Sequence, residues 1–144
     1  MLRSLVGSEM CIRDRGYIDS FYTASTYGDQ GNRSEAQAPV SASLWVDYHV
    51  SAAGLGGLTV GGGARHTGRK PGDSANSFDV PAYTVYDVTL RYDLGRLEPG
   101  LRGLQASLNV QNLFDREYVS DCNYSFGCYY GQERVASVQM SYDW

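Results

Sequence analysis

Apolar and polar residues alternate along most of this chain in runs of about ten residues, and each run ends in a cluster of Gly, Pro, Asn, Asp or Ser. The C-terminal run, VASVQMSYDW, is the clearest case. Because successive side chains of a β-strand point to opposite faces, such alternation predicts strands with one apolar and one polar face. Strands of this kind are predicted over residues 39–50, 58–68, 81–94, 103–114, 135–144 and, with a poorly defined register, 16–27.

The connections between these strands alternate in length. Segments 51–57 and 95–103 are short, whereas 26–38, 68–80 and 120–132 are longer and polar. Outer-membrane β-barrels have short periplasmic turns and longer extracellular loops. If the last strand ends in the periplasm, all three longer connections lie outside. The pattern therefore predicts an all-β fold made of antiparallel transmembrane barrel strands.

Six strands are too few to close a barrel around their own side chains, since about eight is the working minimum. Two unpaired edges would remain, and unpaired backbone groups are not tolerated in lipid. We therefore expect the chain to be part of a larger barrel. A membrane helix is not expected, because no stretch approaches the ~18 consecutive apolar residues that it needs. The mildly polar mean hydropathy of −0.36 is compatible with alternating strands.

Composition supports a membrane location. The chain has 12 Tyr and 17 Gly, and Tyr is enriched where one end of a side chain is dry and the other wet. Lys70 is the only lysine, and 12 Lys+Arg stand against 16 Asp+Glu, for a net charge of −4. This negative balance argues against nucleic acid as a partner.

Residues 1–15 differ from the remainder of the chain. They have neither the alternation nor the Tyr and Gly content of residues 16–144, and Glu9, Arg13, Asp14 and Arg15 do not fit a secretory signal peptide. We predict that this leader is not native to the protein and resembles translated sequencing-adapter sequence; an atypical strand end is the alternative. The predicted barrel segment then covers residues 16–144.

Three motifs point to one family. The final strand places Val138, Met140, Tyr142 and Trp144 on one face, which resembles the signal that the outer-membrane assembly machinery recognises. After Asn112 the alternation slips, which indicates a bulge or a strand end. Here the run NVQNLFDREYV resembles the Asn-Leu-Phe-Asp motif near the end of TonB-dependent receptors. The matching residues are Asn112, Leu113, Phe114, Asp115 and Tyr118.

The third motif is a pair of cysteines, Cys122 and Cys128, in the predicted last outer loop. In an oxidising exterior they can close a small ring that stabilises the loop. Together with the Tyr-Gly and Arg that come after it, the pair resembles the last extracellular loop of ferrichrome-type siderophore receptors within that family. The likeness extends from about Gly16 to Trp144.

The resemblance implies the last six strands of a 22-stranded barrel in the outer membrane of a Gram-negative bacterium. It implies a receptor that takes up a ferric siderophore with energy delivered by TonB, through an N-terminal plug that this chain lacks. No cofactor is expected. Outer-loop aromatics are the first candidates for ligand contact, although an interfacial girdle or loop packing is an alternative role: Tyr124, Phe126, Tyr129 and Tyr130.

Other functions are less well supported. A passive porin or barrel adhesin is the main alternative, and a secreted carbohydrate-binding β-sandwich is another. No enzyme is expected, because Ser41, Asp47 and His49 simply share one polar strand face. A metal site is not expected either, because His49 and His66 should lie at opposite ends and on opposite faces.

Overall fold

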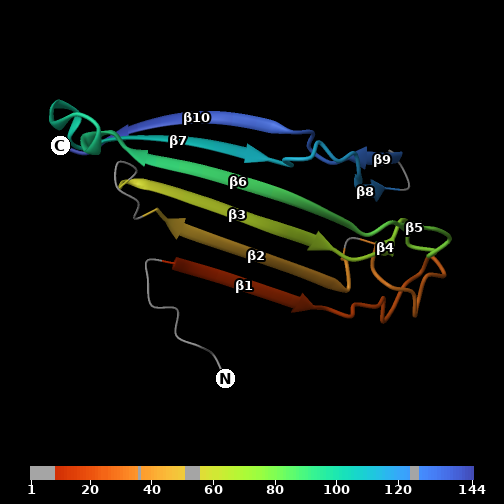
Figure 1. The fold of residues 1–144 in the computed structure, drawn as a ribbon. Helices are drawn as coiled ribbons and strands as arrows, with labels where there is room; N and C mark the ends of the chain where they lie inside the picture. The colour runs from red at the N-terminus through yellow and green to blue at the C-terminus, as the bar shows by residue number, and fades with distance from the viewer. Residues whose placement is uncertain (1–8, 36, 51–55, 124–126) are drawn as a thin grey trace, which may run out of the picture.

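The computed structural model describes residues 9–35, 37–50, 56–123 and 127–144. Six antiparallel strands lie side by side in one open, twisted layer (Figure 1). This confirms the predicted all-β fold. In spatial order the strands are β1 (Glu9–Tyr17), β2 (Val40–His49), β3 (Leu58–Thr67), β6 (Tyr83–Asp93), β7 (Leu104–Gln111) and β10 (Val135–Tyr142).

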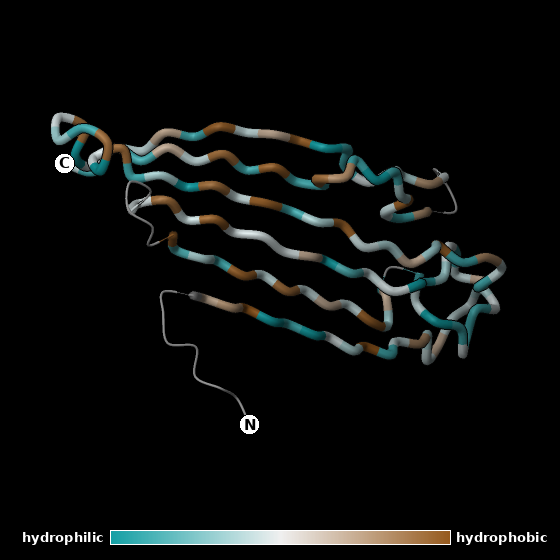
Figure 2. The backbone as a smooth tube through the Cα atoms, viewed as in Figure 1, coloured by the Kyte–Doolittle hydropathy of each residue, from teal (hydrophilic) through white to brown (hydrophobic). Residues whose placement is uncertain are grey.

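The register gives the sheet one apolar face, called the outer face below. Directly opposed residues of neighbouring strands point to the same side. One such row crosses five strands as Tyr48, Val60, Leu90, Leu108 and Val138. Figure 2 shows the alternation of hydrophobic and hydrophilic residues along the strands. Within β2, β3, β6, β7 and β10 the outer face carries no Asp, Glu, Lys or Arg.

This apolar face is not covered by any other part of the described chain. Val138 is 74% exposed and Met140 is 66% exposed. The fully buried apolar residues among those described are Val80, Val85 and Cys122, all near one end of the sheet. A sheet of this size in water would bury such a face against a second layer. The outer face is therefore suited to contact with lipid.

The first strand differs from the prediction. A strand was expected over residues 16–27, but β1 covers Glu9–Tyr17, and the described residues after it form an irregular connection with one isolated bridge. The boundary follows from pairing: Tyr17 lies opposite Val40, the first residue of β2. Among the described residues, the pairing with β2 continues past that point only as a bond from Ile18 N–H to the carbonyl oxygen of Pro39 at 2.9 Å.

The pairing of β1 also gives it an unusual outer face. Arg13 lies opposite Leu44 and Arg15 lies opposite Ala42, so both arginines point to the apolar side of the sheet. A charged side chain on the lipid face of a barrel costs about 2–4 kcal/mol near the bilayer midplane. Of the six strands, β1 alone breaks the pattern required by a membrane.

The three long connections meet at one end of the sheet, as the loop lengths predicted (Figure 1). They contain short strands that the sequence pattern did not reveal: β4 (Lys70–Pro71) with β5 (Asp79–Val80), and β8 (Val119–Asn123) with β9 (Gly127–Tyr130). The 3-10 helices η1 (Leu94–Arg96) and η2 (Pro99–Leu101) lie at the opposite end. Within the described residues no helix is long and apolar enough to cross a membrane.

Candidate functional site: the inner wall and the outer loops

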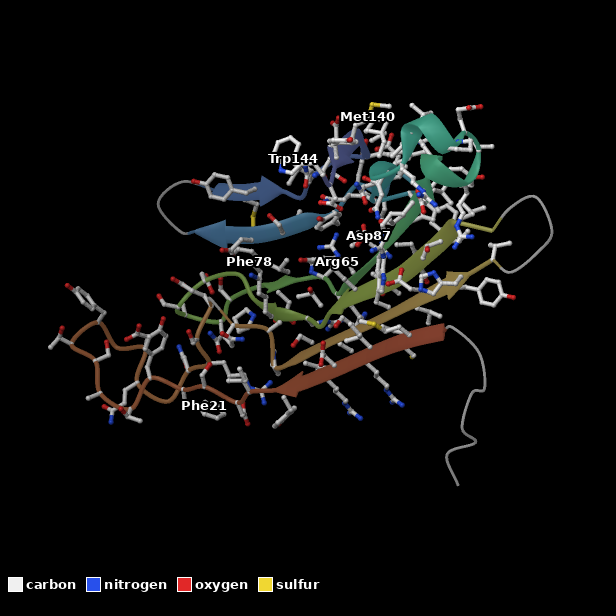
Figure 3. All side chains as sticks on the ribbon, turned by 90° about the vertical axis from the view of Figure 1, so that its left-hand side faces the viewer. Phe21, Arg65, Phe78, Asp87, Met140 and Trp144 are labelled. Carbon is white, nitrogen blue, oxygen red and sulfur yellow. A yellow bond between two sulfur atoms is a disulfide. The ribbon has the colours of Figure 1, made fainter. Side chains whose placement is uncertain are left out.

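The second face of the sheet, called the inner wall below, is polar and internally paired. The Arg65 guanidinium donates from Nε to Asp87 Oδ2 at 2.7 Å and from Nη2 to Asp87 Oδ1 at 3.2 Å (Figure 3). Arg91 Nη2 donates to Asp47 Oδ1 at 3.1 Å. Both carboxylates are largely shielded from solvent, at 13% and 14% side-chain exposure. Each arginine therefore neutralises one carboxylate, and the wall carries little free charge at these positions.

The indole ring of Trp45 packs over the glycine-rich stretch of β3 on this wall. A Cβ atom at Gly61 would lie 2.9 Å from Trp45 Cζ2, and one at Gly63 would lie 3.2 Å from Trp45 Cζ3. Gly62 points to the outer face, where the nearest atom would be 3.9 Å away. The two inward glycines thus make room for the Trp45 ring on the inner wall.

The polar residues of β2 do not assemble a catalytic group. His49 Nδ1 is paired with Thr59 Oγ1 at 2.7 Å, while Asp47 accepts from Arg91. His66 lies on the outer face and pairs with Thr84 Oγ1 at 2.9 Å. In the part of the chain that the structure describes, no cluster of three or more His, Cys, Asp or Glu side chains is placed to hold a metal ion.

Asn112 comes directly after β7 and joins three segments at the loop end of the sheet. It is 3% exposed and has a positive φ of 50°, a conformation that Asn tolerates better than most residues. Its Nδ2 donates to the carbonyl oxygens of Arg116 at 2.9 Å and Gln132 at 3.0 Å, and its Oδ1 accepts from Arg116 N at 2.9 Å. Its own backbone N–H donates to Asp87 Oδ1. Asn112 therefore links the inner-wall pair to the final loop.

The next three motif residues extend this junction. Leu113 N donates to Tyr86 O at 2.7 Å, which continues the contact with β6 beyond the end of β7. The Phe114 ring packs edge-on against Tyr86 with centroids 5.4 Å apart. Asp115 Oδ1 accepts from Arg134 N at 2.8 Å. The Asn-Leu-Phe-Asp motif thus fastens β6, β7 and the start of β10 together.

Tyr118 completes the junction. Its ring stacks on Tyr83 with centroids 4.1 Å apart and occupies the space that a Cβ atom at Gly131 would need. A cavity of about 300 Å³ opens beside this stack. It is lined by residues from three segments, among them Pro81, Ala82, Tyr83, Arg116, Tyr118 and Tyr130.

The predicted last outer loop is a hairpin, β8–β9, which sequence reasoning missed. Cys122 and Cys128 lie directly opposite each other and are joined by a disulfide. Tyr129 and Tyr130 on β9 are exposed, at 52% and 77%. Tyr124 and Phe126, the other two candidate ligand contacts, lie outside the described residues. The hairpin thus presents two exposed tyrosines, and Tyr130 lines the cavity beside the Tyr83–Tyr118 stack.

The C-terminal motif lies on an edge strand. β10 pairs with β7 only among the described strands, and Val138, Met140 and Tyr142 point to its outer face. Trp144 comes after the strand, fully exposed, with its ring 6.0 Å from that of Tyr142. The four residues therefore form one apolar stripe beside an unpaired strand edge.

The structure combines three features: an open antiparallel sheet, an Asn-Leu-Phe-Asp turn that links β6, β7 and β10, and a disulfide-bonded hairpin. Residues 14–113 match the family model described as "TonB dependent receptor-like, beta-barrel". The chain belongs to this family. TonB-dependent receptors are transport receptors of the Gram-negative outer membrane, so the sheet lies in that membrane.

Individual members of the family show how far the likeness extends. The chain is 50% identical over 119 residues to the ferrichrome outer membrane transporter/phage receptor of Escherichia coli K12, covering 82% of this chain and 15% of that protein. It is 40% identical over 128 residues to the ferrioxamine B receptor of Salmonella typhimurium, covering 88% of this chain and 18% of that protein. The chain therefore spans less than a fifth of the curated relatives it matches.

A solved structure of another TonB-dependent receptor gives the same fold. The siderophore receptor PiuA of Acinetobacter baumannii superposes with a TM-score of 0.74 at 26% identity, covering 94% of this chain and 19% of that one. The sheet is thus a small part of a receptor barrel, as the two unpaired strand edges require.

Proposed function

We propose that this chain is the C-terminal wall of an outer-membrane receptor that takes up a ferric siderophore, with energy delivered through TonB. The observation that carries the proposal is the family match on a sheet whose outer face suits lipid and whose inner wall is polar. Relatives named as ferrichrome and ferrioxamine receptors support the substrate class. The role is transport, without a catalytic step.

A passive porin or adhesin barrel is a weaker candidate. A porin lumen uses rings of charged side chains that face the permeating solute. On this wall Asp47 and Asp87 are instead neutralised by neighbouring arginines. The family match is also to TonB-dependent receptors. Both observations favour a receptor.

The hairpin β8–β9 is proposed to contact the siderophore. Tyr129 and Tyr130 are exposed, and Tyr130 also lines the cavity beside the Tyr83–Tyr118 stack. Aromatic rings grip the apolar parts of a ligand and exclude water from its polar groups. Tyr124 and Phe126 remain candidates for the same role.

Replacing Tyr129 and Tyr130 together with alanine, in a complete receptor carrying residues 16–144, is expected to weaken ferric siderophore binding. Loss of two aromatic contacts, each worth about 1 kcal/mol, corresponds to roughly a thirtyfold rise in Kd. Binding of ferrichrome and ferrioxamine to the purified receptor is the measurement. Tyr48→Leu, on the outer face at the opposite end of the sheet, is the matched control. Unchanged affinity for both ligands would remove the two tyrosines from the site.

Partners follow from the same proposal. The outer face contacts membrane lipid, and the stripe of Val138, Met140, Tyr142 and Trp144 is offered to the outer-membrane assembly machinery. We propose that TonB acts through an N-terminal plug of the complete receptor. No nucleic acid partner is proposed.

Residues 1–15 are proposed to be foreign to the receptor. The support is the position of Arg13 and Arg15 on the outer face, where the other five strands have no Asp, Glu, Lys or Arg. Two arginines there would cost several kcal/mol in lipid. A native strand would place apolar residues at these positions.

A further inference from the structure

Lys70 is the only lysine of the chain, and it is 7% exposed although it lies in an outer connection. Its Nζ donates to Asp121 Oδ1 at 2.9 Å. A buried ammonium is costly unless it has a partner, so its presence in a segment of this kind needs an explanation. The partner comes from β8, 51 residues further along the chain.

The carboxylate of Asp121 connects this lysine to the disulfide hairpin. The same oxygen, Oδ1, also accepts from the backbone N–H of Cys122 at 2.9 Å. Cys122 is in turn joined to Cys128 on β9, next to Tyr129 and Tyr130. A single carboxylate oxygen thus joins the connection between β3 and β6 to the strand pair that carries the two exposed tyrosines.

The connection that bears Lys70 is itself rigidly built. Asp73 is 4% exposed and accepts from both the backbone N–H and the hydroxyl of Ser77. Asn76, with φ at 54°, uses its side-chain amide to bond both the N–H and the carbonyl of Arg33, at 2.9 Å each. Residues 68–80 are therefore fixed to the preceding outer connection on one side and to the hairpin on the other.

We propose that Lys70 is a positioning residue for ligand binding: through Asp121 it holds β8–β9 in place, and with it Tyr129 and Tyr130. This rests on the proposed siderophore contact of the two tyrosines. The neighbouring cation offers a contrast, because Arg69 is 72% exposed and lies 3.7 Å from an exposed Asp79. An exposed pair of that kind contributes little.

The two ends of the ion pair are not equivalent. Lys70 is buried, with 9% of its side chain exposed, whereas Asp121 is 54% exposed. Lys70→Met replaces the buried chain by one of similar length without charge, so residues 68–80 keep their packing. Asp121→Asn leaves the ammonium buried without an anion, so residues 68–80 must open as well.

Hydrogen exchange of the complete receptor, monitored by mass spectrometry, tests the proposal. Lys70→Met and Asp121→Asn are both expected to speed exchange in β8 and β9 about tenfold. Only Asp121→Asn speeds exchange in residues 70–80, and the double variant behaves like Lys70→Met. Arg69→Met changes neither segment. Unchanged exchange in β8 and β9 in the two single variants would overturn the proposal.

Siderophore affinity completes the test and separates it from the proposed ligand contact. We expect Kd for the preferred ferric siderophore to rise about tenfold in Lys70→Met and to stay unchanged in Arg69→Met. If the double tyrosine variant binds weakly and Lys70→Met binds normally, Lys70 does not position the hairpin for binding. If the double tyrosine variant binds normally, the ligand contact itself is wrong, while hydrogen exchange still decides whether Lys70 holds the hairpin.

Discussion

Replacing Asn112 with alanine in the complete receptor is expected to lower the free energy of unfolding by about 3–5 kcal/mol. The change removes three side-chain hydrogen bonds, each worth about 1 kcal/mol, and leaves the bonded backbone groups of Arg116 and Gln132 without this partner. It also puts alanine at a φ of 50°, which costs about 1–2 kcal/mol more. The measurement is the temperature at which the receptor changes from the gel mobility of the folded form to that of the unfolded form.

Three controls separate the causes of this loss. Asn112→Gly removes the bonds but tolerates the positive φ, so it should regain only the free energy that alanine loses to backbone strain. Asn112→Asp keeps the acceptor for Arg116 N–H and loses both donated bonds. Glu117→Ala, at an exposed position in the same turn, should have little effect. If the Asn112→Ala receptor were as stable as the Glu117→Ala receptor, Asn112 would not stabilise the junction between β7 and the final loop.

A charge on the outer face should be far more damaging than the same charge one residue away. Leu108→Arg on β7 points to lipid, between Leu90 and Val138, and is expected to cost about 2–4 kcal/mol. Ser107→Arg on the same strand points to the polar inner wall, opposite Arg91, and should cost only about 1 kcal/mol. The measurements are the free energy of unfolding of both receptors in lipid bilayers and the yield of folded receptor in outer membranes.

The pair of variants is matched in strand, depth and side chain introduced. Its result therefore depends on which face meets lipid. Equal losses in Leu108→Arg and Ser107→Arg would show that the outer face is not lipid-exposed and that the barrel assignment of this sheet is wrong.

The faces of five strands could be predicted from the sequence because a period of two is a strong local signal. The rows through Val60, Leu90 and Leu108 result directly from it. The first strand was misplaced because Tyr17 and Phe21 continue a weak alternation past the last residue that β2 can pair with. The end of β1 is set by where its pairing with β2 stops, which the sequence of β1 alone does not show.

Contacts between distant segments could not be predicted in the same way. The strands of β4–β5 have two residues each, too few to show a period. Nothing local in the sequence indicates that Lys70 meets Asp121, or that the Asn112 amide reaches Gln132. The motif around Asn112 was recognisable by resemblance alone, and its physical role appears only when the turn is folded.

The most direct test of the receptor assignment is a long read of genomic DNA through the codons for residues 1–20 and about two kilobases upstream. We expect the frame matching residues 16–144 to continue upstream into further alternating strands, a plug and a signal peptide, and the codons for residues 1–15 to be absent. A read in which Met1 starts the gene, with residues 1–15 intact and no barrel upstream, would contradict the assignment to a siderophore receptor.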